Sequence, residues 1–307
     1  MRRKTKSNIF NILKYYIIHI ILYISKLIIR YLPWVVALKL NALPFVLRYI
    51  WRYRYDVIRQ NLTNSFGQNL SPKAIKDIHI KYYRVLTDYI KESLFTAAWP
   101  LEKIRQKIEF EDGKKWNEYF GNQISTIITA SHYGNWEMNM VLFPALVHQK
   151  VVAFYKPISS PEIEDIMKKI RSRHGLILYP IEQTIRIMTK FSNENILYIF
   201  IGDQTPLNMN GVYWNTFLGQ DTPWLTGAEK LAKKYNYPVV YLKQQPSDIN
   251  KKYYTLSIEM IADAPNRTLD GEITEKYSSI LEEEINNKPE YWLWSHQRWK
   301  RGNQRNE

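Results

Sequence analysis

His132 and Glu137 are the two side chains of this 307-residue chain whose types and spacing best fit proton-transfer chemistry. The histidine follows a β-prone run that begins near residue 124, and the glutamate comes five residues later. A carboxylate that contacts one imidazole nitrogen fixes the tautomer and makes the other nitrogen more basic. We therefore expect the pair to act as a general base toward an alcohol, with Glu137 orienting His132.

The spacing of this pair also predicts its local structure. Residues five apart on one helix point about 140° away from each other, so the pair can meet only if His132 stays in a turn while Glu137 lies on the following helix. Gly134 permits a tight turn, and Asn135 is a preferred helix N-cap. The sequence therefore predicts a strand, a turn and a helix around this pair.

Other chemistries fit the sequence less well. Cysteine is absent, which excludes a thiol nucleophile, a thiolate metal site and a disulfide framework. The zinc-protease motif has two histidines four residues apart, and His132 has no such partner, so we expect no metal and no cofactor. Ser131 is a candidate nucleophile beside His132, but adjacent strand residues point to opposite faces of a sheet.

The elements that must position this pair are predicted from periodicity and turn residues. Strand patterns occur at 124–131, 151–155, 175–179, 196–201, 238–242 and 253–260, and helical patterns at 71–98, 160–174, 182–193, from 226 onward, and 270–287. Ser71 and Pro72 favour a helix start, and Thr226 with Glu229 has the form of a capping box. The alternation predicts an α/β fold with a mostly parallel sheet flanked by helices, whose ligands bind at the carboxyl ends of the strands.

Basic residues are concentrated at the amino-terminal end. Eleven lysines and arginines precede the first acid, Asp56, in a chain whose net charge is +14. Residues 7–30 form one apolar half on a helical wheel, as in a helix that lies in or spans an anionic membrane; a buried core helix is the alternative. The aromatic and basic run 51–55 suits the headgroup level. We expect a membrane-associated segment at 1–55, a catalytic domain at 56–307 and no nucleic-acid binding.

Residues 132–137, His-Tyr-Gly-Asn-Trp-Glu, resemble the signature of the bacterial lipid A biosynthesis acyltransferases, the lauroyl and myristoyl transferases of the lysophospholipid-acyltransferase-like superfamily. Matching segments follow in order at 155–157, 202–204, 226–232 and 289–300, and one precedes the core at 59–62. Lys156 departs from this pattern, because the family usually has arginine there. The resemblance covers about residues 10–301.

This resemblance implies a glycerolipid-acyltransferase-like fold and transfer of a fatty acyl chain from a thioester, on acyl carrier protein or on CoA. The acceptor would be a hydroxyl of a lipid A precursor, made for lipopolysaccharide at the cytoplasmic face of the bacterial inner membrane. The same chemistry on a lysophospholipid, a glycosylated phosphoinositide or an aminoacyl lipid is the alternative. A lipid hydrolase is disfavoured because no Gly-x-Ser-x-Gly elbow occurs, and the His132/Glu137 pair argues against a non-catalytic membrane binder.

Several residues are candidates for binding substrate in such a reaction. The backbone amides of Gly134 and Asn135 are expected to donate to the oxyanion of the tetrahedral intermediate. Lys156, Arg171 and Arg173 are candidates for binding acceptor phosphates or the phosphopantetheine of the carrier, although the two arginines also fit a solvated helix face.

Two further polar residues of the resemblance follow the strand expected at 196–201. Asp203 and Gln204 are expected to position a sugar or headgroup hydroxyl, although both also fit an ordinary turn. His296 and Arg298, near the carboxyl terminus, are expected to pack rather than to react.

Overall fold

The computed structural model describes residues 43–111, 125–247 and 252–302, together with the single residues 16, 20 and 23. Its main sheet has seven strands in the order β1-β9-β8-β2-β5-β3-β4. These strands are Ile108–Phe110 (β1), Thr126–Ala130 (β2), Lys150–Tyr155 (β3), Leu176–Pro180 (β4), Ile196–Ile201 (β5), Val239–Pro246 (β8) and Tyr254–Ala262 (β9). All pairings in this sheet are parallel except β8 with β9, which confirms the predicted mostly parallel α/β sheet.

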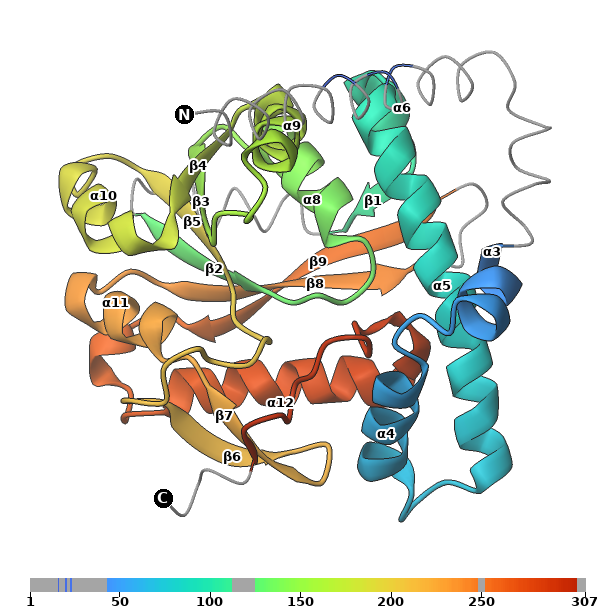
Figure 1. Cartoon of the computed structure of the whole chain (residues 1–307). Coiled ribbons are helices and arrows are strands. Elements are labelled where there is room, and N and C mark those ends of the chain that lie inside the picture. Colours follow the sequence, from blue (N-terminus) through green and yellow to red (C-terminus); the bar gives the residue numbers. More distant parts are fainter. Residues whose placement is uncertain are drawn as a thin grey trace, which may run out of the picture.

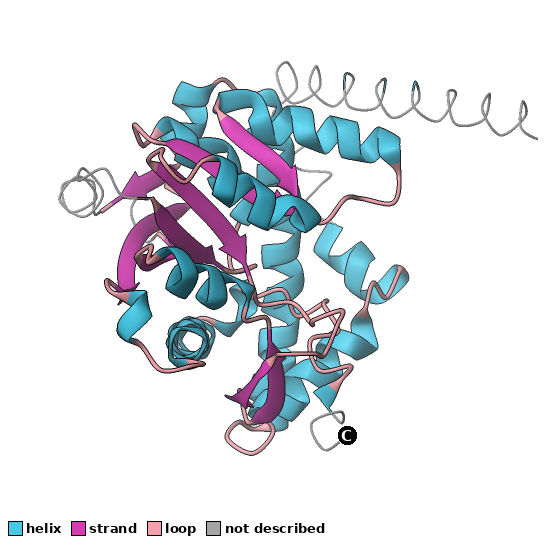
Figure 2. Ribbon diagram, turned by 90° about the vertical axis from the view of Figure 1, so that its left-hand side faces the viewer, coloured by secondary structure: helices cyan, strands magenta, loops and turns pink. Residues whose placement is uncertain are grey.

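Helices cover both faces of this sheet (Figures 1 and 2). The α-helices are Leu43–Phe45 (α3), Tyr55–Phe66 (α4), Pro72–Ala98 (α5), Leu101–Arg105 (α6), Trp136–Leu142 (α8), Pro161–Arg171 (α9), Thr184–Lys190 (α10), Gly227–Tyr235 (α11) and Glu272–Asn287 (α12). Short 3-10 turns occur at Phe143–Ala145, Ser172–His174, Ile181–Gln183, Pro265–Arg267 and Pro289–Tyr291, and a π-helix, η1, at Val46–Ile50. In Figure 1, α8 and α9 lie on one side of the sheet and α11 and α12 on the other, while the long helix α5 runs past the end of the sheet beside α4.

The central strands are buried on both faces. All five residues of β2 are buried, and so are the first four of β5, which lies beside it. Such continuous apolar runs are typical of parallel strands that carry helices on both sides. The core therefore fixes the ends of β2 and β5 firmly, and the loops that follow them start from a rigid edge.

The strand bounds agree with the sequence predictions to within a few residues, but three strands were missed. β1 is only three residues long. The strands β6 (Tyr213–Phe217) and β7 (Gln220–Trp224) form a separate antiparallel hairpin, and their polar, partly exposed residues lack the apolar runs by which the central strands were recognised. The last predicted strand, β9, exists but is antiparallel to β8, to which a short connection joins it.

The helix starts predicted at Ser71, Asn135 and Thr226 are confirmed, and the first two have the expected cap hydrogen bond. The Ser71 side chain accepts a hydrogen bond from the Ala74 amide at 3.2 Å, and the Asn135 side chain accepts one from the Met138 amide at 3.0 Å. The predicted capping box at the start of α11 is wrong. Its threonine makes no cap hydrogen bond and donates to the Gly211 carbonyl instead.

The predicted amphipathic helix at 7–30 lies outside the described residues, apart from the three single positions, so it stays a prediction, as does the division of the chain at residue 55. No helix in the described part of the chain combines the length and the apolarity needed to cross a bilayer. The described segment 43–55 carries Phe45, Tyr49, Ile50 and Trp51, each more than half exposed.

Candidate active site

His132 and Asp203 are brought together by two neighbouring parallel strands. Ala130, the last residue of β2, is the register partner of Ile201, the last residue of β5. His132 and Asp203 each lie two residues beyond these strand ends, so they meet at the carboxyl edge of the sheet, where ligands bind in open α/β folds. Nδ1 of His132 lies 2.6 Å from Oδ1 of Asp203.

The Asp203 carboxylate accepts three hydrogen bonds from the protein. Besides the contact with Nδ1, its Oδ2 accepts from the backbone N–H of His132 and from Nε1 of Trp292, each at 2.9 Å. Burial opposes the charged form, but His132 and the hydrogen bonds outweigh burial and lower the pKa of Asp203 to about 2. Asp203 is therefore an ionised, fixed acceptor that holds the proton of His132 on Nδ1.

The other nitrogen of His132, Nε2, faces the side-chain amide of Gln204 at 3.2 Å. Because Nδ1 donates to Asp203, Nε2 carries a lone pair, and the amide of Gln204 donates to it. The His132 side chain is 15% exposed, and the Trp136 ring packs edge-on against the imidazole, with ring centroids 4.8 Å apart. A hydroxyl that displaced this amide would face the lone pair of Nε2, whose direction is fixed by the contact between Nδ1 and Asp203.

Glu137 does not make the expected contact with His132, because its carboxylate pairs with Arg171. Nε of Arg171 donates to Oε2 of Glu137 at 2.8 Å and Nη2 donates to Oε1 at 2.5 Å. Glu137 does lie on the helix after the turn, as expected. However, the neighbouring Trp136 faces His132, and successive helix residues point about 100° apart, so Glu137 faces α9.

The amides of Gly134 and Asn135, expected to bind an oxyanion, are turned into the protein. The Gly134 N–H donates to the Tyr291 carbonyl at 3.0 Å, and both residues are buried. With its amide oxygen toward Asn135, the Gln244 side chain accepts from the Asn135 N–H at 3.1 Å. The turn itself is as expected, because Gly134 has a φ of +63°.

The three basic candidates have different surroundings. Arg171 is paired with Glu137, as described above. Arg173 donates to the carbonyls of Ala97 at 3.0 Å and Trp99 at 2.9 Å, so it stabilises the carboxyl end of α5. Lys156 is exposed just beyond β3, the strand next to β5, and of the three it is the one whose charged group the described residues leave open to a ligand.

Ser131 points away from the imidazole lone pair. Its Oγ lies 2.8 Å from the Tyr241 hydroxyl, which in turn donates to Oε2 of Glu284 at 2.5 Å. Burial raises the pKa of Glu284 to about 8. This buried chain lies behind the sheet edge and holds Ser131 in place, which disfavours the nucleophile interpretation.

Sequence reasoning missed Glu92 and Trp292, and it gave Asp203 a different role. Oε2 of Glu92 accepts from the Asn135 side chain at 2.9 Å and from the Tyr254 hydroxyl at 3.0 Å, so Glu92 holds the N-cap of α8. Burial raises the pKa of Glu92 to about 7. Its position on the apolar stripe of the predicted helix 71–98, where an acid is unexpected, is the signal by which Glu92 could have been found. Trp292 comes from a segment 89 residues beyond Asp203, a separation that no local pattern spans.

A small apolar cavity lies beside the histidine. It is lined mainly by the core residues Trp136, Met140, Phe143, Ile199, Ile201 and Leu242. Within the described ranges no group of histidine, aspartate and glutamate side chains is arranged to hold a metal ion. The chemistry available from these residues is therefore proton transfer at Nε2, beside an apolar wall.

Comparison with known proteins places the chain in a family. The model of the family described as "Bacterial lipid A biosynthesis acyltransferase" matches residues 3–301, nearly the whole chain. The match includes both strand ends that carry His132 and Asp203. No curated relative matches the chain.

Proposed function

The chain belongs to the bacterial lipid A biosynthesis acyltransferase family, and from this premise we propose that His132, held by Asp203, is the general base for transfer of a fatty acyl chain from a thioester to a hydroxyl of a lipid A precursor. Membership of this family supports acyl transfer to a lipid acceptor as the reaction. The observation that carries the mechanism is the 2.6 Å contact between Nδ1 of His132 and the buried carboxylate.

The proposed step begins at Nε2 of His132. This nitrogen takes the proton of the acceptor hydroxyl while the hydroxyl oxygen bonds to the thioester carbonyl carbon. The tetrahedral intermediate then expels the thiolate as the carbon–sulfur bond breaks, and the imidazolium returns its proton to the sulfur. Asp203 stabilises the imidazolium during this cycle and stays ionised.

Gln204 is the proposed donor to the developing negative charge. Its side-chain amide lies 3.2 Å from Nε2 of His132, so it stands beside the place where the attacking oxygen must be. When the acceptor hydroxyl takes its place at Nε2, this neutral donor stays next to the reacting atoms, where its hydrogen bond gains strength as the carbonyl oxygen becomes an oxyanion. This role replaces the one expected for the amides of Gly134 and Asn135, because those amides face the protein interior.

Lys156 and Arg171 are the two basic residues that we propose for the binding site of the acyl donor. Lys156, exposed beyond β3, is the proposed partner for a phosphate of the phosphopantetheine arm or of CoA. Arg171 is held through two nitrogens by Glu137, so the role we propose for Glu137 is to position this arginine.

The segment 43–55, which carries several exposed apolar side chains, is the proposed contact with the cytoplasmic face of the membrane. Tyr49, Ile50 and Trp51 are 54%, 63% and 68% exposed, and Arg52 and Arg54 follow directly. Exposed aromatic and aliphatic side chains beside arginines match the headgroup region of an anionic bilayer. A lipid acceptor would then reach the site without leaving the membrane surface.

The test of this function is acyl transfer by the purified full-length protein. A fatty acyl group with a radiolabel in its chain is supplied as a thioester of acyl carrier protein or of CoA, together with a lipid A precursor. The label in the extracted lipid is then counted. We expect His132→Gln to lower the rate by at least about a thousandfold, because general-base catalysis and the orientation of the acceptor are both lost. Near wild-type transfer by a folded His132→Gln protein would refute the mechanism.

The same chemistry on a lysophospholipid, a glycosylated phosphoinositide or an aminoacyl lipid is the alternative. The carboxamide-lined groove between α4, the β6–β7 hairpin and segment 297–302 is the observation that favours a glycosylated acceptor among these. Mass spectrometry of total cell lipids with and without the gene separates the acceptors, because one lipid class alone should differ by the mass of one acyl group.

A further inference from the structure

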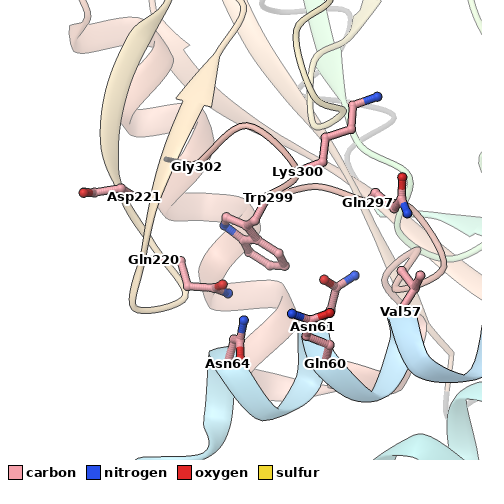
Figure 3. Close-up of a pocket in the computed structure, with 10 residues that line it drawn as sticks. All are labelled: Val57, Gln60, Asn61, Asn64, Gln220, Asp221, Gln297, Trp299, Lys300 and Gly302. Atoms are coloured by element: carbon pink, nitrogen blue, oxygen red, sulfur yellow. The ribbon is translucent and has the colours of Figure 1, made fainter. Parts of the chain in front are cut away.

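A polar groove lies between α4, the β6–β7 hairpin and the carboxyl-terminal segment 297–302 (Figure 3). Its volume is about 490 Å³, within the range of roughly 300–1,000 Å³ that is usual for ligand sites. No residue of the proposed chemistry lines it. The groove is therefore a separate cavity that needs its own explanation.

Carboxamide side chains dominate the lining of this groove. Five of its ten lining residues are Gln60, Asn61, Asn64, Gln220 and Gln297. Figure 3 shows the side chains of Asn61, Asn64 and Gln220 gathered around the ring of Trp299. A carboxamide offers two donors and one acceptor oxygen, so such a set can pair with groups that both donate and accept, as sugar hydroxyls do.

Asn61 is a built part of this lining rather than a surface side chain. It is only 8% exposed, and its Nδ2 donates to the carbonyls of Trp294 and His296, both at 2.9 Å. Both hydrogens of its amide nitrogen are thus used. Because these two bonds fix the amide, the oxygen Oδ1 is the atom that Asn61 can present to a ligand hydroxyl in the groove.

Trp299 gives the groove a fixed aromatic wall. Its Nε1 donates to the Thr222 hydroxyl at 2.8 Å, and its ring packs against the rings of Phe217 and Trp292. The ring is held from behind while the other side faces the carboxamides (Figure 3). A pyranose has one face of C–H groups that packs well on such a ring, with its hydroxyls pointing outward.

The charges of the groove argue against a phosphorylated ligand. Its two charged residues, Asp221 and Lys300, have opposite signs, and Figure 3 shows both side chains directed away from the carboxamides. A phosphate needs clustered cations or several N–H donors aimed at one point. An uncharged polyhydroxyl group fits the lining better.

We propose that this groove binds an uncharged glycosyl unit of the acceptor lipid. The proposal rests on the proposed function and deepens it, because the loop that carries Gln204 is hydrogen-bonded to the wall of the groove. The Thr205 hydroxyl donates to the backbone carbonyl of Gln297 at 2.9 Å, and Thr205 directly follows Gln204, which contacts His132. A glycolipid held in the groove would therefore contact the segment 297–302, which is hydrogen-bonded to the loop that carries Asp203 and Gln204.

The test is ligand-observed NMR on the full-length protein in detergent, with methyl β-glucoside and glucose 1-phosphate as probes. The variant Gln60→Ala/Asn64→Ala removes two exposed carboxamides of α4 from the groove, and alanine is compatible with that helix. The matched control is Gln68→Ala/Asn193→Ala, which removes two exposed carboxamides that do not line it.

We expect saturable millimolar binding of methyl β-glucoside to the wild-type protein and to the control variant, and weaker binding of glucose 1-phosphate. The α4 variant should bind methyl β-glucoside about tenfold more weakly, as the loss of two modest hydrogen bonds implies. Absent binding, equal affinity in the α4 variant, or tighter binding of glucose 1-phosphate would overturn the proposal.

His132→Gln separates this proposal from the proposed function. The variant should bind methyl β-glucoside like the wild-type protein while it fails to transfer acyl groups. Glucoside binding together with transfer that survives in His132→Gln would refute the base and leave the groove intact. Transfer that is lost in His132→Gln, with no glucoside binding in any variant, would refute the groove alone.

Discussion

Asp203→Asn is the substitution that most directly tests how the site works. Three donors converge on this carboxylate: Nδ1–H and the backbone N–H of His132, and Nε1–H of Trp292. An asparagine keeps the shape but replaces one acceptor oxygen with an N–H₂ group. If that group faces Nδ1, the histidine adopts the other tautomer, with its proton on Nε2, and the base is lost.

The expected magnitude follows from the strength of these contacts. In the serine-protease triad the equivalent change lowers kcat about 10⁴-fold, or about 5 kcal/mol in activation free energy. We expect a loss of about 10³–10⁴-fold for Asp203→Asn. The pKa of Asp203 is lowered from 3.8 to about 2, so its charge stabilises the fold above pH 3.8 by about 2 kcal/mol, and this is lost as the pH falls toward 2.

Acyl transfer and urea unfolding at pH 7 measure both effects on the same protein. We expect Asp203→Asn to lower the free energy of unfolding by about 2 kcal/mol and to remain folded at room temperature. Glu137→Gln is the matched control, because it changes the other carboxylate near the turn, which binds Arg171. Its rate should fall far less, by about tenfold. A severe loss in Glu137→Gln with a mild one in Asp203→Asn would refute this assignment and restore Glu137 as the orienting residue.

Three further predictions concern the membrane contact, a buried acid and the turn. Ile50→Ser/Trp51→Ser should weaken sedimentation with phosphatidylglycerol vesicles by about tenfold, since two exposed apolar side chains are lost; unchanged sedimentation would place the contact elsewhere. The pKa of Glu92 is raised from 4.5 to about 7, so between these pH values the folded state binds more protons than the unfolded state. The free energy of unfolding should therefore fall by about 3 kcal/mol as the pH rises through this range. Glu92→Gln should flatten this pH dependence in urea titrations. Gly134→Ala, at a φ of +63° with a new Cβ 3.0 Å from Gln244, should lower the unfolding free energy by about 1–3 kcal/mol, and an unchanged melting temperature would contradict the strain.

The central sheet and the position of His132 could be predicted because their signals are local. Apolar runs mark β2 and β5, and a glycine with an N-cap asparagine marks the turn and α8. The antiparallel course of β9 and the hairpin β6–β7 could not be predicted, because the direction and pairing of half-exposed strands depend on tertiary contacts. The prediction therefore succeeded where burial is continuous along the chain.

The sequence pairs His132 with Glu137, whereas in the structure its contact is with Asp203, and this difference has a specific reason. Glu137 is near in sequence, and Asp203 is 71 residues away. Which of them reaches the imidazole depends on β2 and β5 being neighbours, and strand order is not written in any single segment. Because Ala130 and Ile201 are register partners, residues two positions beyond each strand end lie close together, so the observed pair of His132 and Asp203 follows from topology rather than from spacing.

The same topology separates the proposed chemistry from the proposed choice of acceptor. His132, Asp203 and Gln204 come from the ends of two core strands, where any shift would disturb the whole sheet. The groove of carboxamides comes from α4, the β6–β7 hairpin and the segment after residue 296, all outside the main sheet. Exposed residues such as Gln60 and Asn64 can change without moving His132. An acyltransferase built in this way can keep one mechanism while its groove adapts to another headgroup, so the acceptor is best sought through the groove rather than through the base.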